Sequence, residues 1–142
     1  MDGIEELRQF SRENLHRIWK TTKEGRTLTG EEHRLSEAMR AHPEYHNAWE
    51  FADLTGPTRY EGEGNNPYLH ITVHAIVEGQ LEADDPPEVT QALQRLRRSG
   101  FNRHDAIHLI GTAWIRGMHP VLAGGKAFEL EKYRKHLRRL GR

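Results

Sequence analysis

Apolar residues recur at helical spacing along most of this chain. Over residues 4–23 the apolar positions are Ile4, Leu7, Phe10, Leu15, Ile18 and Trp19. This spacing predicts an amphipathic first helix, which Gly25 closes. Thr29 and Glu32 follow the capping-box pattern, in which a hydroxyl and a carboxylate satisfy free backbone N–H groups. They predict a second helix that reaches His42.

Proline and glycine mark the next boundaries. Pro43 predicts the end of the second helix and the start of a short turn, because proline fits only the first turn of a helix. Three glycines and Pro57 predict a loop over residues 53–66. Asn66-Pro67 is an N-cap followed by proline at the first helical position, so a third helix is expected over residues 67–83.

The last third of the chain predicts three more helices. One begins at Glu88 and stops at Gly100, and the next, which Asn102 can cap, covers residues 103–116. A loop is expected from Gly117 to Gly125. The final helix is basic and is built on Phe128, Leu130, Tyr133, Leu137 and Leu140. With no strand-period run in competition, the expected fold is all-α, a compact single domain (residues 1–142) of about five to six helices.

Helices 67–83 and 103–116 stand out because they carry almost no charge. Charged residues make up 30% of the chain, yet between Pro67 and Leu81 the only one is Glu78. From His104 through Ile115 the only one is Asp105. A helix that is apolar on most faces must be buried, so both helices are expected at the centre of the fold.

Each of these two helices also carries a histidine pair with a spacing of four. The pairs are His70 with His74 and His104 with His108. Residues four apart on a helix have Cβ atoms about 5–6 Å apart, so two imidazoles can reach one ion at about 2.0–2.1 Å. The four histidines therefore predict a site for one divalent transition metal, zinc, iron or nickel, with Glu78 as a further ligand or a second-sphere acceptor.

The four histidines could instead have a purely structural role. A buried histidine is often a hydrogen-bonded core residue, although burying four imidazoles without partners would leave polar groups unsatisfied. A third pair, His42 and His46, spans Pro43 and so does not lie on one continuous helix. It either joins the site or fills a capping or surface role at the helix break.

Several other classes of site are excluded. The chain has no cysteine, which removes disulfides, thiolate nucleophiles and cysteine-based metal motifs. Glu13 and His16 match one fragment of a di-iron bundle, but the remaining ligands are missing. The beginning of the sequence lacks the pattern of a signal peptide and no stretch is apolar enough to span a membrane, so a cytoplasmic location is expected.

Charged residues are unevenly distributed along the chain, although its net charge is zero. Residues 1–94 hold nine basic and eighteen acidic side chains, whereas residues 95–142 hold twelve basic and three acidic ones. Opposite charges attract, so this asymmetry predicts docking of the C-terminal helices on the acidic part. A nucleic-acid surface is the less favoured interpretation.

Several segments also resemble a family of small bacterial proteins catalogued only as a domain of unknown function. They are His42-Pro43-Glu44-Tyr45-His46, Asn66-Pro67-Tyr68-Leu69-His70 with His74, Gln80, Pro86-Pro87, and Arg103-His104-Asp105 with His108. The resemblance covers residues 42–108 and implies kinship without an activity. The family pattern places an acid directly before the glutamine, where this chain has Gly79.

Three functions compete on this evidence. The leading hypothesis is a mononuclear metal protein, in which the ion either polarises water for hydrolysis or locks two helices together. The second is a metal-free interaction module whose basic C-terminal third binds an acidic partner or nucleic acid. The third, a phosphohydrolase of the His-Asp class, rests only on the dipeptide His104-Asp105. Whether the protein is an enzyme stays open.

Overall fold

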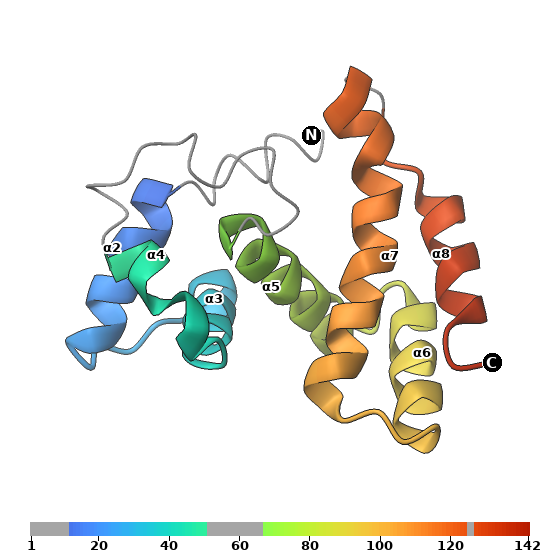
Figure 1. Ribbon diagram of the computed structural model, residues 1–142, viewed down its shortest axis with the longest axis horizontal. Coiled ribbons are helices and arrows are strands. Elements are labelled where there is room, and N and C mark those ends of the chain that lie inside the picture. The colour runs from blue at the N-terminus through green and yellow to red at the C-terminus, as the bar shows by residue number, and fades with distance from the viewer. Residues whose placement is uncertain (1–11, 51–66, 125–126) are drawn as a thin grey trace. The chain divides into compact units, whose positions relative to one another are not determined.

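The computed structural model describes residues 12–50, 67–124 and 127–142. All regular structure in these residues is helical, which confirms the all-α fold class (Figure 1). The elements are α2 (Arg12–Lys23), α3 (Gly30–Arg40), the 3-10 turn η1 (Pro43–Tyr45), α4 (His46–Glu50), α5 (Pro67–Ala83), α6 (Pro87–Arg98), α7 (Arg103–Gly124) and α8 (Leu130–Arg139). The loop predicted over residues 53–66 lies outside the described residues.

The chain divides into two compact units. Of the described residues, 12–50 and 67–75 form the N-terminal unit, and 76–124 and 127–142 form the C-terminal unit. Helix α5 belongs to both, because the boundary falls in its middle. The expectation of a single domain stays a prediction.

The N-terminal unit is organised around large apolar side chains of α2, α3 and α4. Its buried cluster is Leu15, Ile18, Trp19, Leu35, Ala38, Met39, Ala48, Trp49, Ile71 and Ala75. Helix α2 packs against both α3 and α4. The indole N–H of Trp19 donates to Glu50 Oε2 at 2.6 Å, which ties α2 to the end of α4.

The C-terminal unit packs α6, α7 and α8 against one another in all three pairs, and Figure 1 shows these helices side by side. Its buried apolar residues are Val77, Val89, Ala92, Leu96, Ala106, Ile107, Ile110, Ala113, Trp114, Met118, Tyr133 and Leu137. The buried hydroxyl of Tyr133 donates to Gln80 Oε1 at 2.6 Å. This bond fastens α8 to the second half of α5 and gives the glutamine of the family pattern a structural role.

Helix α5 has the bounds that the sequence predicted, and it is buried on more than one face. Residues 71–75 are all buried in succession, which a one-sided amphipathic helix would not show. Its lack of charge therefore reflects burial in protein. Among the helices of the described residues, none is both long and apolar enough to cross a membrane.

Two buried or partly buried charge contacts join the basic end of the chain to α6. Glu88 is 6% exposed and accepts hydrogen bonds from Arg134 at 2.9 Å and Arg138 at 3.0 Å. Burial raises the pKa of Glu88, but the hydrogen bonds from Arg134 and Arg138 and the positive charge of Arg134 outweigh it, so the pKa is lowered. Arg95 donates in turn to carbonyl oxygens at the end of α8. Several of the C-terminal arginines thus hold the C-terminal unit together.

Two local predictions were wrong. The predicted loop from Gly117 to Gly125 is instead the continuation of α7 to Gly124. Gly117 does not end the helix but allows a close approach, since a Cβ there would stand 2.7 Å from Phe128 Cε2. Thr29 does occupy the N-cap position of α3, yet its side chain makes no capping hydrogen bond, so the capping box is not formed.

We predict that Glu88→Gln destabilises the protein by about 1–2 kcal/mol at pH 7, because it leaves two arginines facing an uncharged buried side chain. Urea unfolding measures the difference. Glu131→Gln is the matched control, since Glu131 pairs with the same Arg134 but its side chain is 76% exposed. It should cost less than about 0.5 kcal/mol. Equal losses in the two variants would contradict this assignment.

The same contact predicts a pH dependence. Because the folded-state pKa of Glu88 is lowered, its contribution is present above the unfolded value of about 4.3 and is lost as pH falls through the folded pKa. The stability difference between wild type and Glu88→Gln should therefore shrink below about pH 4. A difference that stays constant down to pH 3 would show that ionisation of Glu88 is not its source.

Candidate metal centre

His42 is the most enclosed of the histidines that the structure describes, with 1% of its surface exposed. Helix α3 ends at Arg40, and Pro43 starts η1, so His42 lies at the break between the two. Its Nδ1 lies 2.7 Å from the carbonyl oxygen of Ala38. Since a carbonyl oxygen can only accept, Nδ1 carries the proton and donates it. The lone pair of the neutral ring is then on Nε2.

His70 and His74 stand one turn apart on α5 and face this ring within the N-terminal unit. The Nε2 atoms of His70 and His42 are 3.0 Å apart. The ring of His42 makes edge contacts with both neighbours, with centroid separations of 4.7 Å to His70 and 5.2 Å to His74. His74 is also buried, at 7% exposure. Three imidazoles therefore share one enclosed corner.

His46 has a different environment. Its Nε2 donates to the carbonyl oxygen of Met39 at 3.1 Å, and its ring packs on Trp19 with a centroid separation of 4.7 Å. One ring nitrogen is thus used to anchor α4 to the end of α3. The structure gives the two members of the third pair separate roles, with His42 in the histidine corner and His46 in packing.

His104 and His108 lie one turn apart at the start of α7, in the C-terminal unit. Their rings are 4.2 Å apart between centroids, and both side chains are half-buried. Asn102 caps this helix, because its Oδ1 accepts from the backbone N–H of Asp105 at 2.8 Å, as the sequence predicted. The cap fixes the first turn of α7 and with it the direction of both imidazoles.

Glu78 is held by Arg103. The two guanidinium nitrogens donate to both carboxylate oxygens, at 2.6 Å and 2.9 Å. The hydrogen bonds to Glu78 raise the pKa of Arg103. Glu78 therefore lies in a bidentate ion pair with Arg103, which fixes the direction of its carboxylate.

In the N-terminal unit His42 and His74 are both buried, and their rings are in contact. In the C-terminal unit the rings of His104 and His108 are in contact. Each of these four residues offers one imidazole nitrogen that could bind a metal ion, and three of the four belong to the ligand set proposed from the sequence. His70 lies next to His42, and Glu78 lies in the ion pair with Arg103. Which of these residues bind an ion stays a prediction.

His42 was outside the ligand set proposed from the sequence, because Pro43 interrupts the spacing that marks the other pairs. Spacing reports partners on one helix only, whereas His42 meets α5 through the tertiary structure. Two signals pointed to it: its place in the segment shared with the family, and the neighbouring aromatic residues Tyr45 and Trp49. His42 and Tyr45 stack with centroids 5.9 Å apart.

The chain was compared with family models, with curated proteins and with solved structures. The model of a family described as Domain of unknown function (DUF1841) matches residues 7–139. No curated protein and no solved structure matches the chain.

We predict that metal-free protein holds His42 as the Nδ1–H tautomer, because Ala38 O can accept only from a protonated Nδ1. Two-bond nitrogen–proton NMR correlations distinguish the two tautomers of a neutral imidazole. An Nε2–H tautomer at His42 would contradict the arrangement. The exposed His33 on α3 serves as the reference for an imidazole in water.

Proposed function

We propose that this chain, which belongs to the DUF1841 family, binds one divalent transition-metal ion through His42, His74, His104 and His108. The observation that carries the proposal is the enclosed corner of the N-terminal unit in which the ring of His42 meets the imidazoles of His70 and His74. Imidazole nitrogen is a ligand for zinc, iron and nickel alike, so the donor set favours this group of metals over magnesium or calcium.

The hydrogen bond from His42 to Ala38 supports the proposal. Histidine ligands in proteins commonly donate their second ring N–H to a carbonyl or carboxylate, which fixes the tautomer and aims the lone pair at the ion. His42 has this arrangement without any metal, since its Nδ1 is bonded to Ala38 O. The partners of Nε2 are themselves imidazoles, which are potential metal ligands, and this distinguishes His42 from a buried histidine bonded only to backbone groups.

His70 is the natural donor to His42 when no metal is bound. With Nδ1 protonated, Nε2 of His42 accepts, and Nε2 of His70 can supply the proton over 3.0 Å. An ion bound to Nε2 of His42 would take the place of this hydrogen bond, and His70 would then be a further candidate ligand.

The number of nitrogens bears on the role of the ion. Four imidazoles would fill the four-coordinate shell that zinc prefers, so a zinc ion held by all four would have a structural role and no position for water. Iron and nickel accept five or six ligands, so the same set leaves room for water or substrate. Metal-dependent hydrolysis is the catalytic form of this proposal, and it requires such an open position.

Both oxygens of Glu78 accept hydrogen bonds from Arg103 in the bidentate pair. We therefore assign Glu78 to positioning rather than ligation: by holding Arg103 it fixes the residue directly before His104 at the start of α7. This sets the first turn from which His104 and His108 project.

The alternative, a metal-free module that binds an acidic partner or nucleic acid, remains a second proposal with narrower support. Arg95, Arg103, Arg134 and Arg138 make contacts within the C-terminal unit, which removes them from a free basic surface. Arg97 and Arg98 of α6 are exposed. The cytoplasmic location and bacterial origin expected from the sequence also remain predictions.

We predict that metal-free protein takes up about one equivalent of zinc, nickel or iron(II), and that its melting temperature rises on binding, because a ligand that prefers the folded state stabilises it. His74→Ala and His104→Gln should weaken binding about tenfold or more. His33→Ala, an exposed histidine on α3, is the matched control and should bind as wild type does. Elemental analysis and calorimetry measure stoichiometry and affinity.

Two readouts separate loss of a ligand from loss of the fold. His104 is half-buried, so its glutamine variant should keep the helical circular dichroism and urea midpoint of metal-free wild type while losing metal affinity. If the wild-type protein binds no stoichiometric metal, or if His33→Ala weakens binding as much as His74→Ala does, the proposal fails.

A further inference from the structure

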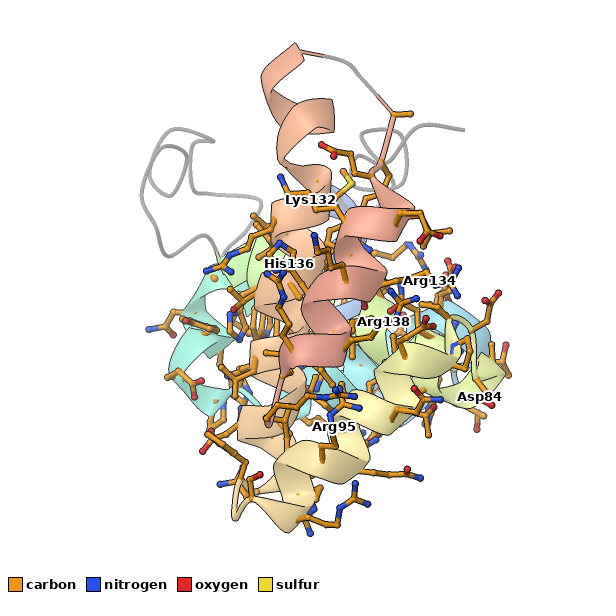
Figure 2. All side chains as sticks on the ribbon, turned by 90° about the vertical axis from the view of Figure 1, so that its right-hand side faces the viewer. Asp84, Arg95, Lys132, Arg134, His136 and Arg138 are labelled. Atoms are coloured by element: carbon orange, nitrogen blue, oxygen red, sulfur yellow. The ribbon has the colours of Figure 1, made fainter. Side chains whose placement is uncertain are left out.

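A second site lies on the C-terminal unit, between α7 and α8. It is an open hollow of about 450 Å³, lined by Ile115, Arg116, Lys132 and His136. Figure 2 shows Lys132 and His136 along one edge of α8, while Arg134 and Arg138 lie along the other edge. None of the four lining residues belongs to the histidine group proposed to bind metal.

The charges at this hollow are all of one sign. Arg134 and Arg138 on the far edge of α8 are balanced by Glu88, whereas in the described part of the chain no carboxylate pairs with Arg116 or Lys132. Burial lowers the pKa of His136, and the positive charges of Arg116, Arg139, Lys132 and Lys135 lower it further. The imidazole thus reports a positive field where α7 and α8 meet.

The hollow also has an apolar wall. Ile115 is 37% exposed although it belongs to one of the two least charged helices of the chain. An exposed isoleucine beside an arginine and a lysine suits a ligand with both an anionic and an apolar part. Since the arginine fork matches phosphate oxygens and the lysine adds a point charge, phosphate is the anion that uses this pair most fully.

We propose that this hollow binds a small phosphorylated molecule, with its phosphate held by Arg116 and Lys132 and its apolar part resting on Ile115. Its volume falls in the range of small-molecule sites. A nucleic-acid strand fits less well, because the exposed Glu129 and Glu131 interrupt the positive charge at the start of α8. Binding of phosphate at this hollow does not depend on the proposed metal site.

The pKa of His136 should change when a phosphate binds in the hollow. A phosphate dianion beside the imidazole favours its protonated form, so binding should raise the pKa of His136 and take up a fraction of a proton near neutral pH. For a phosphate ester, whose second pKa is about 6, affinity should then increase as pH falls from 8 toward about 6.5, above the range in which the dianion itself takes up a proton. The charged groups that face His136, Arg116 on α7 and Lys132, Lys135 and Arg139 on α8, all keep their charge over this range.

The test uses the full chain, freed of metal by chelation so that phosphate cannot bind a metal ion. Phenyl phosphate and inorganic phosphate are titrated at fixed ionic strength while the carbon-bound ring protons of His136 are followed by NMR. Phenyl phosphate should bind more tightly than inorganic phosphate and should raise the pKa of His136. Arg116→Gln and Lys132→Gln should each weaken binding about tenfold, because each removes a charged hydrogen bond.

Two controls make the result specific. Arg98→Gln removes the same charge from the exposed end of α6, away from the hollow, and should leave binding unchanged. Ile115→Ser should weaken binding of phenyl phosphate but not of inorganic phosphate. The proposal is overturned if neither phosphate binds at millimolar concentration or if Arg98→Gln weakens binding as much as Arg116→Gln does. A single-stranded oligonucleotide that binds where phenyl phosphate does not would assign the surface to nucleic acid instead.

Discussion

A neutral imidazole withdrawn from water must find a donor for one ring nitrogen and an acceptor for the other. His42 meets this requirement inside the protein: Ala38 O accepts from Nδ1, and Nε2 faces the Nε2 of His70. The partner of Nδ1 is thus a backbone carbonyl with a fixed position, and the partner of Nε2 is another histidine. This arrangement directs a lone pair toward other imidazoles, and the proposed chemistry of the protein depends on it.

The surrounding structure supplies that arrangement by simple local means. Pro43 ends the course of α3, which places His42 at the break instead of on the regular helix. Asn102 caps α7 and Glu78 holds Arg103, so the turn that carries His104 and His108 begins in a defined way. Each device is a short-range interaction, and each orients a side chain whose partners are distant in sequence.

Sequence patterns predicted what depends on local chemistry and missed what depends on tertiary contacts. Asn66-Pro67 marked the start of α5, because proline is favoured there in any context. Gly117 was interpreted as a helix end, since its close contact with Phe128 is invisible to local pattern. Thr29 and Glu32 match the sequence pattern of a capping box, but the Thr29 side chain makes no capping hydrogen bond. For the proposed site, spacing along one helix predicted His70, His74, His104 and His108, whereas His42 becomes a candidate only through its contacts with α5 in the fold.

The basic C-terminal third uses part of its charge inside the fold. Arg134 and Arg138 are bound to Glu88, and Arg95 is bound to the end of α8. Binding of an acidic partner, which the excess of positive charge suggested, stays a prediction. Among the remaining basic residues, Arg116 and Lys132 lie where α7 and α8 meet, beside the exposed Ile115, and this is a narrower and more specific feature than a basic surface.

X-ray absorption spectroscopy of the nickel- or zinc-loaded protein tests the central claim most directly, because imidazole rings bound to a metal give a characteristic multiple-scattering signal. The account predicts a first shell of nitrogen or oxygen at about 2.0–2.1 Å in which at least three ligands are imidazoles. A loaded ion with only oxygen ligands, or with a single imidazole, would contradict it.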